Sequence, residues 1–461
     1  MKIYWENFRS VKIEDDIEIA PITLVIGKNN VGKSSLYSPL LMLSQTLKAT
    51  SLETALLGRG AMTDVGVFKD YIRDHDAERE LKLRFSLPEI RGESNRTPGR
   101  KGNPTISSIE TSFASVDGIS ATLVRQKLLD SEGIAIVNRS RAAASESFTF
   151  ASPLLPDSKT VGRPKKEITE LRRSLRNEQP ENFLFSGFGG LLLPDAYHED
   201  PERWEQIREW YASTSSLYEV QRHAQRRAIR ALSSIHYVGP IRREATRTYR
   251  LTPEPPASVG PDGLHTAEVL FRNRHSELWD KVGETLATMG YGELRFRELS
   301  DEYFQILLNS SASRSEANIA FTGTGVSQIL PVLVQGFLAE RDVLYVTQQP
   351  EIHLNPAQQT HVMDFLIERS EAGARILVET HSDHMLLRLR RRIAEGEIDS
   401  ARVKIYYVEN DDRGNSIVRD VPLTDNGEVQ EGVWPKGFFG ERMHDAFQLA
   451  LAQSRSARKV G

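Results

Sequence analysis

The spacing of hydrophobic residues predicts strands near both ends of the chain and helices between them. The apolar run Ile22 to Ile26 suits a strand that is buried on both faces. Alternating apolar residues in "ELKLRFSL" and "SATLVRQKLL" predict two more strands in the first third of the chain. After residue 236, the strands "VLYV", "ARILVET" and "KIYYVE" alternate with helical segments. This alternation is typical of an open, mostly parallel sheet.

The segment from about residue 160 to 232 has a helical and strongly charged pattern. "KKEITELRRSLRNEQ" predicts one helix, and "DPERWEQIREWYAS" and "YEVQRHAQRRAIRAL" predict two more. The last of these carries Arg222, Arg226, Arg227 and Arg230. A solvated helical face explains such a run, and a surface for DNA or a protein partner is the functional alternative. No heptad run is long enough for an extended coiled coil.

Composition narrows the class of protein without naming a partner. The length of 461 residues favours two or three lobes, and the net charge of -4 argues against a surface that is basic throughout. The absence of cysteine excludes disulfides, thiolate metal sites and a cysteine nucleophile. No window approaches the roughly 20 apolar residues of a membrane span, and the polar start "MKIYWENFRS" lacks a signal-peptide pattern. We therefore expect a cytoplasmic protein with no membrane partner.

The segment "GKNNVGKS", Gly27 to Ser34, matches the phosphate-binding pattern G-x-x-x-x-G-K-[ST] at every specified position. It follows a buried strand and precedes a predicted helix that runs from Ser34 toward Lys48. In that setting backbone N–H groups and the helix N-terminus surround phosphates, the lysine reaches the outer phosphates, and the serine hydroxyl ligates magnesium. We therefore predict that this segment binds a nucleotide together with Mg²⁺. The predicted binding residues are Gly27, Lys28, Asn29, Asn30, Val31, Gly32, Lys33, Ser34 and Ser35.

Three segments far downstream offer further polar groups. "FTGTGVSQILPVLVQ" is a turn of small residues before an apolar helix, where Ser327 and the amides around Gly323 and Gly325 suit a phosphate; a simple helix cap is the alternative. "YVTQQPEIHLNP" is a strand that ends in Gln348 and Gln349. "RILVETHSDHML" is a strand that ends before His381, at the edge where α/β sheets bind ligands.

In this order, the four motifs resemble the ABC-type ATPase heads of the RecF/SMC and overcoming-lysogenization-defect kind. "YVGPIRREATRTY" and the closing "GVWPKGFFGERMHDA", with Trp434, Pro435, Gly437, Phe438 and Phe439, are similar to segments of a small bacterial group of AAA-type ATPases found in phage-defence operons. The resemblance covers roughly residues 1–70 and 235–445. It implies an ABC-type P-loop head with a mostly parallel central sheet, an N-terminal antiparallel β region and a helical insertion.

The resemblance also assigns roles to single residues. Gln45 would be a Q-loop residue. Together with Ser34 and Gln348, it would help to bind magnesium. Gly323, Gly325 and Ser327 would form the signature that contacts ATP on the opposite subunit. His381 would be the switch histidine that faces the γ-phosphate. Because such heads complete their sites in head-to-tail pairs, ATP implies a homodimer or a higher homo-oligomer.

The strand that ends in Gln348 and Gln349 departs from the family, whose heads usually carry two acids there. The nearest group often has Glu-Gln-Pro-Glu, so Gln348 is the unusual residue. A Glu to Gln change removes the charge and the proton acceptor, and loss of a general base costs ~10²- to 10⁴-fold in rate. Three explanations stay open: a deliberate substitution that traps the ATP-bound form, a natural slow switch, or an ordinary enzyme whose acid is Glu351 or Glu379.

Two functional classes follow from the resemblance. In the first, the head is a switch or sensor that controls a separate effector, a nuclease or toxin, in anti-phage defence. In the second, it is an ATP-gated clamp that grips DNA through basic stretches such as Arg172 to Arg176 or Arg222 to Arg230. Glu409, Asp411 and Asp412 faintly resemble the metal site of a nuclease domain, but the stretch after them is short, which favours an effector on a separate polypeptide.

We expect four segments along the chain. Residues 1–130 would form the N-terminal part of the ATPase head, and residues 131–232 a mainly helical insertion. Residues 233–400 would form the C-terminal part of the head, and residues 401–461 a family-specific tail.

Overall fold

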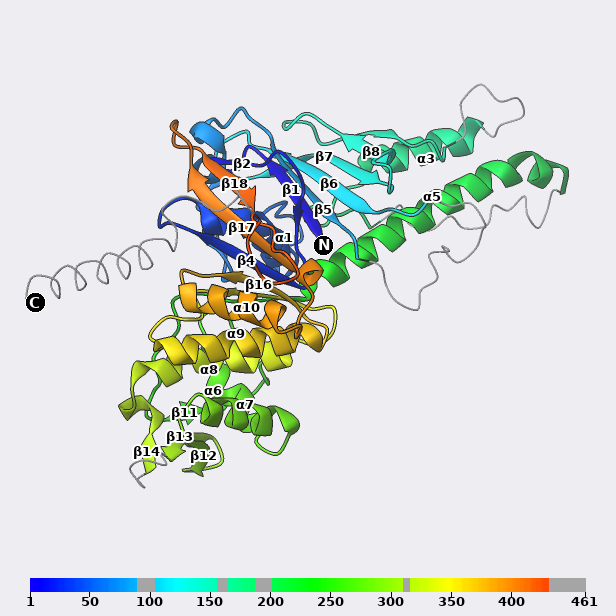
Figure 1. Ribbon diagram of the computed structural model, residues 1–461. Coiled ribbons are helices and arrows are strands. Elements are labelled where there is room, and N and C mark those ends of the chain that lie inside the picture. Colours follow the sequence, from blue (N-terminus) through cyan, green and yellow to red (C-terminus); the bar gives the residue numbers. More distant parts are fainter. Residues whose placement is uncertain (89–103, 156–164, 187–200, 310–315, 431–461) are drawn as a thin grey trace, which may run out of the picture. The chain divides into compact units, whose positions relative to one another are not determined.

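The computed structural model describes residues 1–88, 104–155, 165–186, 201–309 and 316–430 (Figure 1). The chain forms two compact units that exchange short segments. The first comprises residues 1–18 and 34–235, and the second comprises residues 19–33 and 236 onward. The strand Ile22–Gly27 and the P-loop residues up to Lys33 therefore belong to the second unit, as do the three downstream motifs.

An antiparallel sheet forms the centre of the first unit. Its strand order is β3 (Ile17–Glu18), β1 (Lys2–Glu6), β5 (Leu81–Ser86), β6 (Ser108–Ala114), β7 (Thr122–Leu129), β8 (Ala135–Ser140) and β9 (Thr149–Ala151). In β5, every second side chain is buried, as its alternating sequence predicts. The predicted N-terminal antiparallel β region is confirmed. Strands β8 and β9 lie within residues 131–232, so the helices of that segment begin only at Lys165.

The helices of the first unit differ from the sequence expectation in two places. They are α1 (Ser38–Leu47), the short α2 (Phe68–Tyr71) and η2 (Arg73–His75), α3 (Lys165–Asn177) and α5 (Pro201–Ser233). The prediction of two helices over residues 201–232 is wrong, because α5 continues through "STSS", where weak helix formers without Gly or Pro do not break a helix. The prediction that a regular helix starts at Ser34 is also wrong: a 3₁₀ turn, η1 (Lys33–Leu36), comes first, and α1 starts where Pro39 fits its first turn.

A second sheet, built around the strand before the P-loop, organises the second unit. The order is β10 (Ile235–Val238), β15 (Leu344–Gln348), β16 (Arg375–Glu379), β4 (Ile22–Gly27), β17 (Val403–Asn410) and β18 (Ser416–Asp420). β4 pairs in parallel with β16 on one side and with β17 on the other, and β16 pairs in parallel with β15. All residues of β4 are buried. The predicted α/β fold with a mostly parallel central sheet is confirmed.

Helices and a smaller sheet complete the second unit. They are α6 (Thr266–Arg272), α7 (Glu277–Thr288), α8 (Thr324–Leu338), α9 (Pro356–Glu371), α10 (Asp383–Ala394), η3 (Ile319–Phe321), η4 (Ser400–Arg402), β11 (Tyr249–Arg250), β12 (Glu293–Glu298), β13 (Tyr303–Asn309) and β14 (Glu316–Asn318). The apolar faces of α8, α9 and α10 share one core with β4, β15, β16 and β17. β17 and β18 fall within residues 401–461, and the tail motif around Trp434 lies outside the described residues.

Among the helices in the described part of the chain, none combines the length and the apolar character that a membrane crossing requires.

We predict that Arg227, on α5, stabilises the first unit. Its guanidinium is buried and donates to three backbone carbonyls, those of Ile106 (2.6 Å), Leu87 (2.9 Å) and Pro88 (3.1 Å). Because Arg227→Met leaves these buried acceptors without a donor, we expect a loss of about 2 kcal/mol or more in stability, seen as a lower Tm in calorimetry. The exposed neighbour Arg226 is the control: Arg226→Met should leave Tm nearly unchanged, and equal effects of the two would refute the assignment.

Candidate functional site

The turn that follows β4 has the backbone of a phosphate-binding loop. Gly27, Asn30 and Gly32 have φ values of 149°, 59° and 87°, a region that glycine adopts freely and asparagine tolerates. A Cβ on Gly27 would collide with the backbone carbonyl of Val408 in β17. Only glycine therefore allows the loop to leave the sheet so close to its neighbouring strand.

Lys33 lies at the end of this loop with its ammonium group already inside the site. It is 5% exposed, and its Nζ donates to the carbonyl of Lys28 at 2.5 Å. Burial lowers the pKa of Lys33, while Glu379 and Glu351 oppose that shift by favouring the charged form. The loop lysine is thus a desolvated cation with two carboxylates in its field, which suits the capture of a phosphate group.

The ends of three parallel strands bring the downstream motifs to this loop. In the sheet register, Gln348 of β15 lies opposite Glu379 of β16, and Glu379 lies opposite Val25 of β4. Because parallel strands present their carboxyl ends at one edge, Gln348, Glu379 and the loop after Gly27 share that edge. Sequence segments more than 300 residues apart therefore meet in one site.

Gln348 has hydrogen-bond partners on both atoms of its amide. Its Nε2 donates to Glu379 Oε2 at 3.1 Å, and its Oε1 accepts from the hydroxyl of Tyr237 at 2.6 Å. An uncharged amide thus stands beside a buried carboxylate. A glutamate at position 348 would place two carboxylates together, and like charges this close disfavour joint ionisation unless a cation intervenes.

Gln349 begins a tight turn after β15. Its φ is 44°, uncommon for a residue with a side chain, and its backbone N–H donates to the carbonyl of Glu379 at 2.7 Å. His353, later in the same turn, also has a positive φ of 61°. Strained backbone of this kind persists where neighbouring contacts fix it, which is common at functional sites.

Glu351 and His381 are in direct contact. The backbone N–H of His381 donates to Glu351 Oε1 at 2.7 Å, while Glu351 Oε2 is buried and has no hydrogen-bond partner among the described residues. Burial raises the pKa of Glu351, which favours its protonated form. Burial also lowers the pKa of the His381 ring, and Lys33 adds to that effect. The site therefore holds one buried acid with an open oxygen, beside an imidazole that tends to be neutral.

The residues of the predicted signature lie at the start of α8. Gly323 caps the helix and is exposed, whereas Gly325 is buried, and a Cβ there would meet the Tyr291 hydroxyl at 2.5 Å and the His353 carbonyl at 3.1 Å. The Ser327 hydroxyl donates to the carbonyl of Thr324 at 2.8 Å. The turn thus requires a small residue at Gly325 on steric grounds, and the helix start at Gly323 and Thr324 is exposed.

Gln45, Ser34 and Ser35 belong to the first unit. The Gln45 amide group donates to the carbonyls of Leu57 (2.7 Å) and Thr63 (3.1 Å), and its Oε1 accepts from the Thr63 N–H (3.1 Å). Its side chain thereby fastens the loop after α1. The Ser34 carbonyl accepts from the Ser38 hydroxyl at 2.7 Å, next to the start of α1. The metal-binding roles of Ser34 and Gln45 stay predictions.

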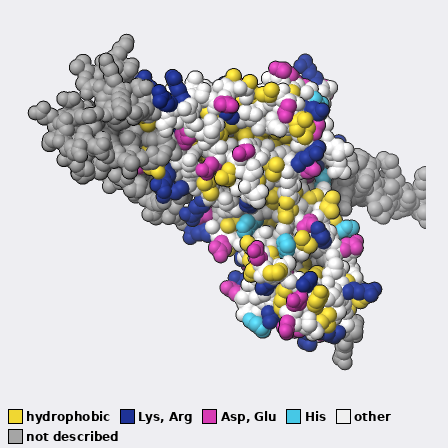
Figure 2. Space-filling model, turned by 180° about the vertical axis from the view of Figure 1, so that it is seen from behind, with side chains coloured by type: hydrophobic (Ala, Val, Ile, Leu, Met, Phe, Trp, Pro, Cys, Tyr) yellow, Lys and Arg dark blue, Asp and Glu magenta, His cyan; other side chains and the backbone are white. Residues whose placement is uncertain are grey.

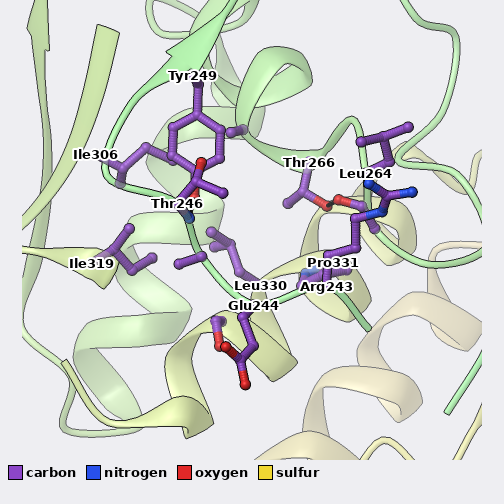
Figure 3. Close-up of a pocket in the computed structure, with 14 residues that line it drawn as sticks. Arg243, Glu244, Thr246, Tyr249, Leu264, Thr266, Ile306, Ile319, Leu330 and Pro331 are labelled. Carbon is purple, nitrogen blue, oxygen red and sulfur yellow. Dashed lines mark hydrogen bonds between the residues drawn. The ribbon is translucent and has the colours of Figure 1, made fainter. Parts of the chain in front are cut away.

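A cavity of about 140 Å³ lies between the segment after β10 and α8. Figure 3 shows Tyr249 and Thr246 near Ile306 and Ile319 on one side, and Arg243 beside Pro331 on the other. Most of its lining is apolar, and Arg243, at its rim, is paired with Asp262 at 2.6 Å. Apolar contact between this segment and the first turns of α8 is therefore incomplete.

Two residues of the site were missed as site residues in the sequence. Tyr237 binds the side chain of Gln348, and Arg242 donates to the carbonyls of Gln348 (2.6 Å) and Gln349 (3.2 Å). Both lie in "YVGPIRREATRTY", so the signal was the motif itself, but nothing in the sequence says that it reaches the end of β15. Contact across about 110 positions is a property of the fold alone.

The acidic group Glu409, Asp411 and Asp412 lies at the turn between β17 and β18. Glu409 is paired with Arg419 at 2.6 Å, and the Asp411 carboxylate accepts from the N–H groups of Arg413 and Asn415. These contacts are those of an ordinary turn. Within the described residues, no three His, Asp or Glu side chains gather as a metal-ion site.

Comparison with known families supports an ATPase. Residues 263–386 match the family model described as the AAA ATPase domain, and residues 398–449 match a family described as a protein of unknown function, DUF3696. No curated protein matches the chain.

Several solved structures of SMC heads align weakly with the chain. The SMC head bound to the C-terminal winged-helix domain of ScpA is 15% identical, with 92% of this chain and 97% of that chain covered and a TM-score of 0.36. The Pyrococcus furiosus SMC head with an extended coiled coil, bound to the C-terminal domain of ScpA, is 13% identical, with 91% and 96% covered. The Thermotoga maritima SMC head domain is 12% identical, with 92% and 98% covered; both TM-scores are again 0.36.

At TM-scores this low, the strand order and the phosphate-binding loop remain the features that define the fold. The match of residues 263–386 to the AAA ATPase domain supports an ATPase, and the turn after β4 has the backbone of a phosphate-binding loop.

We predict that Glu351 lowers the stability of the protein as the pH rises. Because its pKa is higher in the folded than in the unfolded protein, folding is penalised once Glu351 ionises, and the penalty is absent at pH values below the unfolded pKa. Glu351→Gln removes the ionisation and keeps an oxygen for the His381 N–H. The Tm difference between Glu351→Gln and the parent should therefore grow in favour of the variant from pH 5 to pH 8. The same difference at both pH values would contradict this account.

Proposed function

We propose that this protein is a cytoplasmic ABC-type ATPase head that binds ATP, dimerises in response to it, and acts as a switch for a separate effector in bacterial anti-phage defence. The observation that carries the proposal is the edge of the second sheet, where Lys33, Gln348, Glu379, Glu351 and His381 meet. The match of residues 263–386 to an AAA ATPase domain supports the ATPase part. The defence role rests on the resemblance of two motifs alone.

The loop residues would hold the triphosphate. The amides from Gly27 to Ser34 would surround it, and Lys33 would exchange its bond to the Lys28 carbonyl for the more strongly charged phosphate oxygens. Magnesium, when bound with ATP, would neutralise phosphate charge and order the phosphate oxygens. Oxygen ligands suit magnesium. Glu379 and Glu351 are the acids that favour the charged form of Lys33, and the Oε2 atom of Glu351 is buried.

Hydrolysis is expected to be slow because the end of β15 carries amides. An amide cannot take a proton from water, so neither Gln348 nor Gln349 can act as the general base. Glu351 and Glu379 are the remaining candidates; the pKa of Glu351 is raised by burial, and one of its oxygens has no partner among the described side chains. All three explanations of Gln348 are still open, and they predict different rates.

ATP-dependent pairing would complete the site. Gly323, Gly325 and Ser327 lie at the N-terminus of α8, where Gly323 is exposed, and the amides of a helix N-terminus favour anions. In a head-to-tail homodimer they would contact ATP bound to the other subunit. The dimer, present only with ATP, would then offer or hide a surface for the effector.

The decisive experiment is single-turnover ATP hydrolysis by the parent and by Gln348→Glu, with oligomeric state measured by ultracentrifugation. If the amide suppresses turnover, Gln348→Glu should hydrolyse ATP at least about tenfold faster, and the parent should form a long-lived ATP dimer. Mg²⁺ should raise the Tm of Gln348→Glu more than that of the parent, because a cation relieves the new repulsion with Glu379.

Two controls sharpen this test. Gln349→Glu adds the same charge one residue later and should not reproduce the gain, and Lys33→Ala should abolish ATP binding. Equal hydrolysis by the parent and Gln348→Glu would remove Gln348 from the mechanism and favour Glu351 as the base. Absence of both ATP binding and dimerisation in the parent would refute the proposal.

An ATP-gated DNA clamp is the second candidate, and one observation favours it. Arg222, Arg226 and Arg230 are exposed at a spacing of four residues, so they form a stripe on one face of α5. Arg227, which the sequence grouped with them, points inward and is excluded. On the face drawn in Figure 2, Lys and Arg are interspersed with Asp and Glu over much of the surface. DNA binding would therefore depend on a local stripe.

If the protein is a DNA clamp, we predict that the arginine stripe on α5 gives it a salt-dependent affinity for duplex DNA. Replacing all three of its arginines with Gln should lower the slope of log K against log salt by about 2 to 3. The matched control replaces Arg243, Arg247 and Arg250 of the second unit, which are also exposed, and should not alter the slope. Fluorescence anisotropy with a labelled duplex measures both. The clamp reading fails if the ATP-bound parent has no salt-dependent affinity.

A further inference from the structure

The segment 237–242, which begins in β10 and ends beside the cavity, contacts both halves of the candidate site. Within it, Tyr237 binds the side chain of Gln348, and Arg242 binds the backbone that follows. Both contacts reach the strand end that would face ATP on the same subunit, and Arg242 also reaches α8, the helix that would face ATP on the other subunit.

Arg242 is buried, with 4% of its surface exposed, although its neighbours Ile241 and Arg243 are exposed. Its Nη2 donates to the carbonyl of Gln348 at 2.6 Å and to that of Gln349 at 3.2 Å. One guanidinium edge therefore fixes the carbonyls on either side of the bend at Gln349. The N–H of Gln349 is fixed independently by Glu379. The bond to Arg242 helps to hold the positive φ of this turn.

The same guanidinium also reaches α8. Its Nη1 donates to the carbonyl of Gln328 at 3.3 Å, and the Gln328 side chain donates back to the carbonyl of Arg242 at 3.2 Å. Gln328 directly follows Ser327 of the predicted signature. A planar group with five donors can bind both targets at once, which the single ammonium of a lysine cannot do.

The cavity makes this polar link more important. Directly after Arg242, residues 243–246 and Tyr249 line a cavity of about 140 Å³ together with Ser327, Leu330 and Pro331 of α8; Figure 3 shows Leu330 and Pro331 in this lining. Arg242 therefore adds a hydrogen-bonded link between the turn after β15 and the start of α8 to the direct contact of His353 with Gly325.

We infer that Arg242 is a positioning residue that couples the turn at Gln349 to the start of α8. Through this link, nucleotide bound at the P-loop of one subunit changes the conformation of the signature that the same subunit presents to its partner. The inference rests on the proposed function, because it needs ATP to bind the loop after Gly27. It extends that function by naming the connection between a subunit's two nucleotide-facing surfaces.

Hydrogen–deuterium exchange with and without ATP tests the inference, at a concentration where ultracentrifugation shows monomers. In the parent, ATP should slow exchange both in residues 349–353 and in residues 324–330. In Arg242→Lys, ATP should slow exchange in residues 349–353 alone, with about a fivefold or larger loss of the response in residues 324–330. Arg243→Lys, next along the chain and exposed, is the matched control and should behave as the parent.

Two results would overturn the inference. One is a response of residues 324–330 to ATP that is the same in Arg242→Lys and in the parent, or absent from both. The other is a parallel loss of ATP affinity and Tm in Arg242→Lys, which would make Arg242 merely structural. Failure of the parent to dimerise on ATP would refute the proposed switch, yet the exchange pattern of the monomer would still decide the role of Arg242.

Discussion

The close contact between Gly27 and the backbone of β17 is the constraint on which the site depends. β4 is buried on both faces and lies between two parallel neighbours. The phosphate-binding loop therefore has to begin at the carboxyl end of β4, close to the neighbouring strands. There the absence of a side chain lets the loop turn beside the Val408 carbonyl. The same parallel order delivers β15 and β16 to that edge, and Lys33, Gln348, Glu351, Glu379 and His381 all come from these strand ends or from the turns after them.

The balance of charge at this edge follows from burial. Lys33 is one buried cation, and Glu379 and Glu351 are the carboxylates that affect it most. The site tolerates this set because each group has at least one partner, although Glu351 Oε2 has none among the described residues. An amide at position 348 adds hydrogen bonds without adding charge. A third carboxylate there would need a compensating cation, which links the identity of this residue to metal binding.

The second unit also explains how a small local event could influence a distant surface. The turn after β15 is held in an unusual backbone conformation by contacts from two directions, one from β16 and one from Arg242. Turns fixed in this way tend to have discrete arrangements, because the surrounding core is densely packed. The polar link from Arg242 to Gln328 places the start of α8 within reach of such a change.

The sequence by itself determined the phosphate-binding loop, the mostly parallel sheet and the strand ends that carry Gln348 and His381, because these follow from local patterns: a buried apolar run, a fixed Gly-Lys-Ser spacing and a change of period from two to 3.6. It did not determine that α5 is one helix, that Arg227 is buried while Arg226 is exposed, or that Tyr237 and Arg242 reach the end of β15. Such features depend on which carbonyls and amides a side chain meets across long stretches of chain. Only the tertiary structure decides those partners, because most buried polar groups form hydrogen bonds inside the folded protein.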